Sequence, residues 1–188
     1  MLEALFGKAE AGRYPDLRAR VTRQNLVDFR YDFRFDAICI PARSFLHLMG
    51  QDDQIACLRS AFEYLNPGGR LLLNFFNPSL SHLVARAAPA TEYQLVMEAK
   101  HPRTGQTITV SCRQRNDLLE QTQDLDWRFV MDGREHETKM RLRWIYKQEF
   151  ELLLRLAGFA RWQLFGDFAR SACTYDSQEL IWVAERSA

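Results

Sequence analysis

The first half of the chain combines two short apolar runs with one helical pattern of apolar residues. Residues 35–41 (FDAICIP) and 71–76 (LLLNFF) are nearly continuous apolar segments of strand length. Such runs are typical of parallel strands that are buried on both faces of a sheet. Between them, apolar residues recur at helical spacing from a cap at Asp52 or Asp53 to about Leu65. This order predicts a strand–helix–strand unit with a right-handed crossover.

The rest of the chain is mixed in pattern. Apolar spacing predicts a helix over residues 1–11 and a short strand over residues 19–26. From residue 93 to residue 146 the chain is polar, and apolar residues alternate with polar ones, which predicts an antiparallel meander with one solvent-facing side. The other predicted elements are a helix over residues 147–157, closed by Gly158, and strands over residues 161–165 and 180–184.

Composition narrows the class of protein. With 188 residues, 25 Lys and Arg, and 24 Asp and Glu, the chain suits one domain and is nearly neutral, which argues against a strongly basic nucleic-acid binder. Its apolar runs are too short to cross a bilayer, and its first residues do not form a secretory signal. The four cysteines form no C-x-x-C pair and the four histidines have no metal spacing. We therefore expect a cytoplasmic protein with buried or half-buried thiols, without a metal, membrane or nucleic-acid partner.

Four segments, in order, resemble one known family, the class I S-adenosylmethionine-dependent methyltransferases. They are FDAICIPARSFLHL, LNPGGRLLLNFFNP, RLRWIYKQEFELLLRLAGF and GDFARSACTYDSQELIWVAER. They are similar to that family's fourth strand and following loop, its Pro-Gly-Gly turn and fifth strand, its last helix, and its closing hairpin. The resemblance is to the small-molecule branch, which has a short antiparallel insertion before the last helix.

The resemblance implies a fold and an activity. The fold is α/β: a Rossmann-like sheet with an antiparallel insertion and a C-terminal antiparallel hairpin, in one domain over residues 1–188 with the insertion at 91–146. The activity is methyl transfer from S-adenosylmethionine to a nitrogen or oxygen atom of a small-molecule acceptor. Because such transfer relies largely on alignment of the acceptor with the sulfonium, it does not demand a catalytic base.

One departure from the family bears on activity. The family's glycine-rich cofactor loop and its ribose-binding acid have no counterpart before residue 35, where only 34 residues stand. We interpret the chain as N-terminally truncated, with its first strands missing, and expect it to bind the cofactor weakly. The alternative is a non-catalytic remnant that acts as a dimerising scaffold. Either residues 20–26 pair beside residues 37–40, or a symmetric homodimer covers that exposed sheet edge.

The resemblance also implies site residues. Asn25 and Leu26 fall at the adenine position, although Asn25 is equally explained as the end of a strand. Pro41 and Ala42 follow the fourth strand, at the edge where ligands bind in open α/β sheets. Arg43 follows the same strand, and the resemblance assigns Ser44 to the acceptor side, with His47 as the candidate base. Arg141, Arg143 and Tyr146 alternate along one face of a later predicted strand, and an arginine pair there can bind a carboxylate or phosphate of a substrate, so Arg143 and Tyr146 are also assigned to the acceptor side.

The acceptor-side residues have plainer explanations as well. A histidine in FLHL is also typical of a helix start with a satisfied hydrogen bond, and an arginine pair on a strand is also typical of a solvated face. The other histidines, His82, His101 and His136, lie in polar stretches and are interpreted as surface residues.

Overall fold

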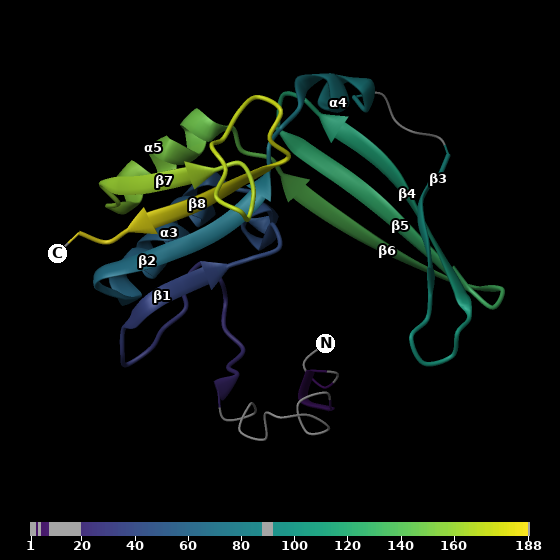
Figure 1. The fold of residues 1–188 in the computed structure, drawn as a ribbon, viewed down its shortest axis with the longest axis horizontal. Coiled ribbons are helices and arrows are strands. Elements are labelled where there is room, and N and C mark those ends of the chain that lie inside the picture. The colour runs from purple at the N-terminus through teal and green to yellow at the C-terminus, as the bar shows by residue number, and fades with distance from the viewer. Residues whose placement is uncertain (1–2, 4, 8–19, 88–91, 188) are drawn as a thin grey trace.

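Two separate four-stranded sheets form the molecule (Figure 1). The computed structural model describes residues 3, 5–7, 20–87 and 92–187 of the chain. The first sheet has the order β1-β2-β8-β7, in which β1 (Phe35–Ile40) and β2 (Leu65–Phe76) are parallel. β8 (Glu179–Glu185) runs antiparallel to both β2 and β7 (Arg161–Phe165). The mixed α/β fold class predicted from the sequence is confirmed.

The predicted strand–helix–strand unit is present. β1 is followed by a short 3-10 helix, η1 (Ser44–His47), and by α3 (Gln51–Tyr64), which leads into β2. The helix cap expected at Asp52 or Asp53 is wrong, because Gly50 is the N-cap and both acids lie in the first turn. There their negative charges still favour the positive end of the helix dipole.

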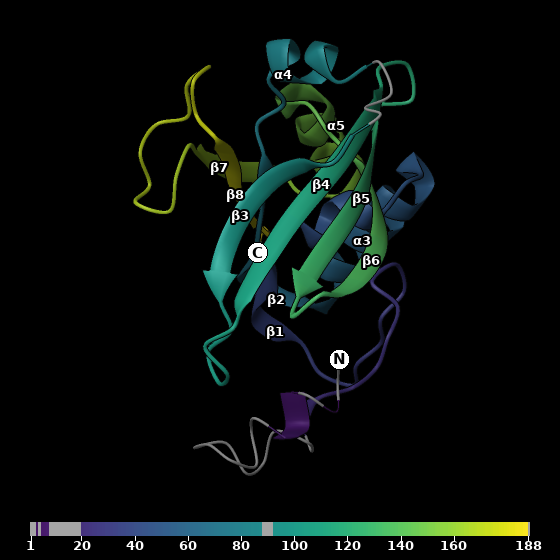
Figure 2. The same ribbon diagram turned by 90° about the vertical axis from the view of Figure 1, so that its right-hand side faces the viewer.

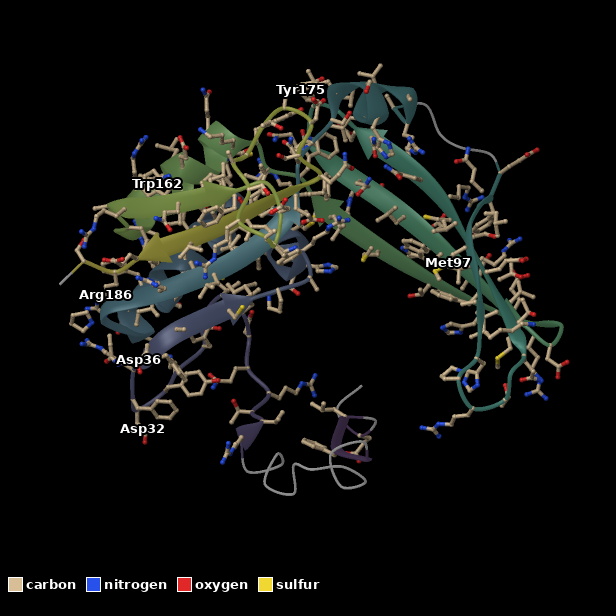
Figure 3. The ribbon with its side chains drawn as sticks, in the orientation of Figure 1. Asp32, Asp36, Met97, Trp162, Tyr175 and Arg186 are labelled. Atoms are coloured by element: carbon tan, nitrogen blue, oxygen red, sulfur yellow. The ribbon has the colours of Figure 1, made fainter. Side chains whose placement is uncertain are left out.

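The first part of β2, directly after α3, depends on Gly69. A Cβ atom on Gly69 would lie 2.8 Å from the carbonyl oxygen of Asn66 and 3.1 Å from that of Phe35, so the backbone needs glycine there. Arg186 binds the nearby end of α3 (Figure 3). Its guanidinium donates to the carbonyl oxygens of Phe62 and Glu63 over 2.9 and 2.8 Å. A cation at the C-terminal carbonyls of α3 stabilises the helix end.

Two helices cover one face of the first sheet. α5 (Lys147–Ala157) packs against α3, and both lie on the same side of the strands (Figures 1 and 2). As predicted, α5 ends at Gly158, which has a φ of 105°. Phe150 of α5 lies 5.1 Å from Phe75 and 4.9 Å from Trp182 between ring centroids, and none of the three is more than 1% exposed. The core of the molecule lies between this face of the sheet and the two helices.

The second sheet is an antiparallel meander with the order β3-β4-β5-β6 (Figure 2). Its strands are β3 (Gln94–Lys100), β4 (Thr107–Asp117), β5 (Thr122–Met131) and β6 (Arg134–Arg143). A short helix, α4 (Leu80–Ala85), lies between β2 and β3 in the chain. The turns before β4 and β6 contain Gly105 and Gly133, which both have positive φ.

The two faces of the second sheet differ in chemistry. One face carries ion pairs across the strands, among them Arg113 with Asp126 at 2.7 Å and Arg128 with Glu137 at 3.0 Å. The other face is apolar. Two of its residues, Leu125 and Leu142, are buried in the same hydrophobic cluster as the interior of the first sheet.

The strand expected over residues 19–26 is wrong. Residues 21–25 have no regular secondary structure, and within the described residues β1 pairs with β2 alone, so the expected pairing beside residues 37–40 is wrong as well. Side chains hold this segment instead: the amide of Gln24 exchanges hydrogen bonds with the backbone of Arg30, and Asn25 Oδ1 accepts from Val27 N. Such bonds compete with a strand ladder. The helix expected over residues 1–11 falls mostly outside the described residues.

β1 is also more exposed than a central parallel strand. The sequence predicts burial on both faces, yet Ala37 and Cys39 are exposed while Ile40 on the other face is 4% exposed. The reason is that α3 and α5 cover one face only. The expectation that all four thiols are buried or half-buried is therefore wrong for Cys39.

Candidate functional site

A cavity of about 560 Å³ lies between the two sheets, at the carboxyl ends of β1 and β2. The loop after β1 contributes Ala42 and Arg43, η1 contributes His47, and the end of β2 contributes Phe76 and Asn77. The remaining lining residues are Ser79, His82, Leu83, Val96, Cys112, Gln114, Gln123, Leu125, Trp127, Met140, Leu142 and Gln178. The cavity therefore occupies the position where ligands bind in open α/β sheets, and the second sheet forms its far wall.

The rim of the cavity at the end of β1 is a strained turn held by polar side chains. Ala42 and Arg43 both have left-handed backbone conformations, with φ values of 57° and 61°. Ala42 N donates to Asn74 Oδ1 over 3.1 Å, Asn74 Nδ2 donates to Glu179 Oε2 over 3.0 Å, and Arg43 donates to Glu179 Oε1. Asn74 is 8% exposed, so this bonding network fixes the rim from the interior of the sheet.

Two histidines line the cavity. His47, the candidate base, projects from η1 and is exposed. His82, which the sequence assigns to the surface, lines the cavity from α4, and its Nδ1 accepts a hydrogen bond from Arg86 at 3.0 Å. Partial burial and the charge of Arg86 lower the pKa of His82. In the sequence, only the four-residue spacing between His82 and Arg86, which places them on one side of a helix, could have indicated that His82 has a specific partner.

The far wall of the cavity is largely apolar. Leu125, Trp127, Met140 and Leu142 face it from β5 and β6, and Cys112 faces it from β4. Burial, with a smaller contribution from Asp126, raises the pKa of the Cys112 thiol, so this cysteine stays protonated and apolar at neutral pH. The wall is suited to exclude water from a bound acceptor.

A second hollow, a groove of about 390 Å³, runs beside the outer edge of β1. It brings Asn25 and Leu26, the predicted adenine-side residues, together with Ala37 and Cys39 of the strand. Asn25 Oδ1 already accepts from Val27 N over 3.1 Å and keeps a second lone pair for a ligand amino group. Leu26 packs against the hydrophobic core at the groove wall.

The groove contains Asn25 and Leu26 but no other element that the family uses to hold its cofactor. No G-x-G sequence occurs anywhere in the chain. Among the residues lining the groove there is no acid to hold the ribose hydroxyls. The described residues also contain no group of three or more His, Cys, Asp or Glu side chains able to hold a metal ion.

Two predicted acceptor-side residues lie elsewhere. Arg143 is buried and bonds Gln54, Gln121 and Glu149, with 2.9 Å to the Glu149 carboxylate. This ion pair joins β6 to α5 and leaves Arg143 away from the cavity lining. Tyr146 is the N-cap residue of α5 and is likewise not among the lining residues.

Pro41 and Ser44 shape the rim rather than line it. The hydroxyl of Ser44 donates to the Pro41 carbonyl oxygen over 2.7 Å, which closes the turn between β1 and η1. The structure thus brings together Ala42, Arg43 and His47 at the cavity, and Asn25 and Leu26 at the groove.

The known proteins to which the chain is similar are methyltransferases. No family model matches the chain. Over 161 residues it is 26% identical to the cypemycin N-terminal methyltransferase of a Streptomyces species, covering 85% of this chain and 61% of that protein. It is similar in structure to the CcbJ methyltransferase of Streptomyces caelestis, with 25% identity and a TM-score of 0.65 over 88% of this chain and 62% of that one.

A third similarity concerns the fold alone. An S-adenosylmethionine-dependent methyltransferase of Clostridium acetobutylicum ATCC 824 has 11% identity and a TM-score of 0.73, covering 97% of this chain and 71% of that one. The fold is that of these methyltransferases, and the resemblance read from the sequence is confirmed. The chain spans less than two thirds of the length of the cypemycin and CcbJ enzymes.

The helices of the described part give no membrane signal. None of them is both long enough and apolar enough to cross a bilayer.

Proposed function

We propose that the chain carries the acceptor-binding side of an S-adenosylmethionine-dependent methyltransferase that acts on a nitrogen or oxygen atom of a small molecule. The observation that carries this proposal is the cavity of about 560 Å³ at the carboxyl ends of β1 and β2. The methyltransferases of similar sequence and structure support the type of reaction. The relative named for N-terminal methylation favours nitrogen over oxygen.

The residues of the cavity have distinct proposed roles. His47 accepts the proton that an acceptor nitrogen must lose before its lone pair is free. Trp127 and Met140 exclude water and hold the apolar part of the acceptor. Arg43 and Ala42 position the acceptor at the rim, because Glu179 and Asn74 hold them in place. Pro41 and Ser44 support the same turn.

The groove beside β1 is the proposed place for the adenine of the cofactor. Asn25 Oδ1 accepts from the adenine amino group, and Leu26 packs on the ring face. S-adenosylmethionine, when bound, supplies a methyl group on a positively charged sulfur. The groove runs along β1 and the cavity adjoins the loop after it, so the proposed donor and acceptor sites are next to the same strand.

The organisation and location are proposals too. We propose one domain over residues 1–188 with an insertion at 91–146, supported by the hydrophobic cluster that joins Leu125 and Leu142 to the interior of the first sheet. A cytoplasmic location is supported by four free cysteines.

A non-catalytic dimerising scaffold is the second candidate. It is favoured by β1, which pairs with β2 alone among the described strands and exposes Ala37 and Cys39. A homodimer of this kind pairs two copies along the outer edge of β1. In that case the edge is covered and the groove is closed to a nucleoside.

Titration with S-adenosylhomocysteine, followed through backbone amide chemical shifts, separates the two candidates. The methyltransferase proposal expects shifts at Asn25, Leu26 and Cys39, with weak affinity because the sequence has no glycine-rich loop. Absence of shifts at saturating ligand contradicts it. Micromolar affinity instead contradicts the interpretation that half of the cofactor site is missing.

A transfer assay tests the acceptor side. Label from methyl-tritiated S-adenosylmethionine is followed into a panel of primary and secondary amines. His47→Asn is expected to lower kcat, with a loss that shrinks as the pH rises and the amine deprotonates unaided. Leu119→Ala is the matched control, since Leu119 is 88% exposed and away from both hollows. An unchanged kcat in His47→Asn removes the base from the proposal.

A further inference from the structure

One wall of the cavity between the sheets contains a buried glutamine without a partner. Gln123 lies in β5 and is 8% exposed, and its side-chain amide makes no hydrogen bond to any residue that the structure describes. Leu125 and Trp127, two and four residues further along the strand, line the same cavity, and alternate residues of a strand share one face. An unpaired buried amide destabilises a fold, so a partner from outside the chain would explain Gln123.

The polar side chains beside Gln123 have fixed hydrogen-bonding directions. Asn116 of β4 is 3% exposed and lies directly across from Gln123 in the sheet. Asn116 Nδ2 donates to the carbonyl oxygen of Leu83 over 3.0 Å, so Oδ1 is the atom that accepts from Gln114 Nε2 over 2.9 Å. Gln114 also lines the cavity, and its Oε1 remains available as an acceptor.

A third polar group is fixed by α4, which lies beside the end of β4 (Figure 1). A guanidinium carries only donors, so Arg86 Nη1 donates to His82 Nδ1 over 3.0 Å, and the neutral imidazole carries its proton on Nε2. His82 therefore offers a donor at the cavity, where Gln114 offers an acceptor and Gln123 offers both.

The charge of the cavity lining narrows the class of ligand. None of the lining residues is Asp or Glu, so the lining supplies no carboxylate to pair with an ammonium group. Arg43 is the only arginine among the lining residues, none of which is Lys, and it is already paired with Glu179. A carboxylate ligand therefore finds no free guanidinium there. The lining is suited to a neutral group that both donates and accepts hydrogen bonds.

We propose that Gln114, Gln123 and His82 bind a carboxamide group of the methyl acceptor. A carboxamide presents a donor and an acceptor side by side, as a glutamine amide does, so the two can form a pair of hydrogen bonds. The acceptor is then an amine that also carries an amide, either within a peptide or within a smaller molecule. This inference rests on the proposed function, because it specifies which amines the cavity accepts.

Four small amines with one aromatic ring in common test the inference by titration, followed through the chemical shifts of the Trp127 indole and the Gln123 side-chain amide. They are L-phenylalaninamide, the methyl ester of L-phenylalanine, L-phenylalaninol and L-phenylalanylglycinamide. The amide is expected to bind roughly 10-fold more tightly than the ester, which has no N–H donor and leaves a buried acceptor unpaired. The alcohol is expected to bind more weakly than the amide.

The outcomes separate this inference from the proposed function. Equal affinity for the amide and the ester, or for the amide and the alcohol, overturns the carboxamide site and leaves the methyltransferase proposal standing. No shift at Trp127 with any of the four amines overturns both. The dipeptide amide distinguishes the two sources of the group. Binding at least as tight as that of L-phenylalaninamide supports an amide within a peptide, and weaker binding supports an amide of a smaller molecule.

Gln123→Met is the matched variant, because methionine keeps the length of the side chain and removes both polar atoms. It is expected to reduce the preference for amide over ester to within about twofold and to raise the free energy of unfolding, since an unpaired buried amide is removed. Lower stability with an unchanged preference assigns Gln123 a structural role and overturns the inference.

Two other glutamines serve as controls. Gln54 is 0% exposed, and its amide is bonded to the carbonyl oxygen of Leu48 and to Arg143, so Gln54→Met is expected to lower the free energy of unfolding and to keep the preference. Gln163→Met, at an exposed position of β7, is expected to change neither. Loss of the preference in Gln163→Met contradicts a role specific to Gln123.

Discussion

The two sheets of this molecule are stabilised in different ways. The first sheet buries one face under α3 and α5, where Phe75, Phe150 and Trp182 are at most 1% exposed. The second sheet carries exposed ion pairs on one face and presents its apolar face to the cavity. Burying a large side chain contributes roughly 1.5–3 kcal/mol, whereas an exposed ion pair contributes about 0–1 kcal/mol. We therefore expect the first sheet to hold the fold and the second to serve recognition.

The largest expected effect is in the core of the first sheet. Phe150→Ala removes a side chain that contacts Phe45, Phe75 and Trp182 and is expected to lower the free energy of unfolding by about 3–5 kcal/mol. Urea denaturation followed by circular dichroism measures it. Leu152→Ala on the exposed side of α5, where 53% of the side chain is open, is the control. Equal losses in the two variants contradict the expectation that the buried face of the first sheet holds the fold.

The next effect concerns the ion pair that connects the second sheet to α5, which covers the first sheet. Arg143 ends β6 and pairs with Glu149 of α5, with side chains 10% and 19% exposed. Arg143→Ala leaves a half-buried carboxylate without its partner and is expected to cost about 3 kcal/mol of unfolding free energy. Arg141→Ala removes an arginine that is 56% exposed and pairs with Asp124 at 2.9 Å, so its expected loss is below about 1 kcal/mol. The same denaturation experiment compares them.

A smaller effect is expected at the groove. Asn25→Ala removes one hydrogen-bond acceptor from the proposed adenine position and is expected to weaken S-adenosylhomocysteine binding by about 1–2 kcal/mol. Calorimetric or chemical-shift titration measures the change. Gln24→Ala is the neighbouring control, because Gln24 bonds the Arg30 backbone and tests whether the segment alone matters. Equal weakening in both variants assigns Asn25 a structural role.

The smallest effect is expected on the charged face of the second sheet. Arg113→Ala breaks the pair with Asp126 at the sheet surface and is expected to lower the free energy of unfolding only slightly, because exposed ion pairs are weak. The loss should shrink further in 1 M salt, where such pairs are screened. Thermal denaturation at two salt concentrations measures both. A loss as large as that of Phe150→Ala would make the ion pairs a principal source of stability.

Local patterns in the sequence predicted most of the elements. The apolar run of β1 and the helical spacing of α3 and α5 are each set by residues close together in the chain. The segment 20–26 was predicted wrongly because its conformation depends on side chains: Gln24 bonds the Arg30 backbone six residues away. The alternation of apolar and polar residues carries no information about such bonds.

The site was only partly predictable, for a related reason. Ala42, Arg43 and His47 follow an apolar strand, and ligands bind there in many open α/β sheets. By contrast, Trp127, Met140 and His82 reach the cavity through the placement of the second sheet and α4, which no local pattern specifies. Arg143 is the opposite case, a residue predicted for the site that lies outside it. Its alternation on a strand suggested a ligand contact, but at the end of β6 it pairs with Glu149 instead.

The rim formed by Ala42 and Arg43 has a consequence for the order of folding. Its left-handed turn is held by bonds to Asn74 and Glu179, which lie 32 and 136 residues further along the chain. The turn is unfavourable on its own and gains its partners only after β2 and β8 have paired. The rim of the cavity therefore forms late, and in the native protein it opens at a lower free energy than the sheet that supports it.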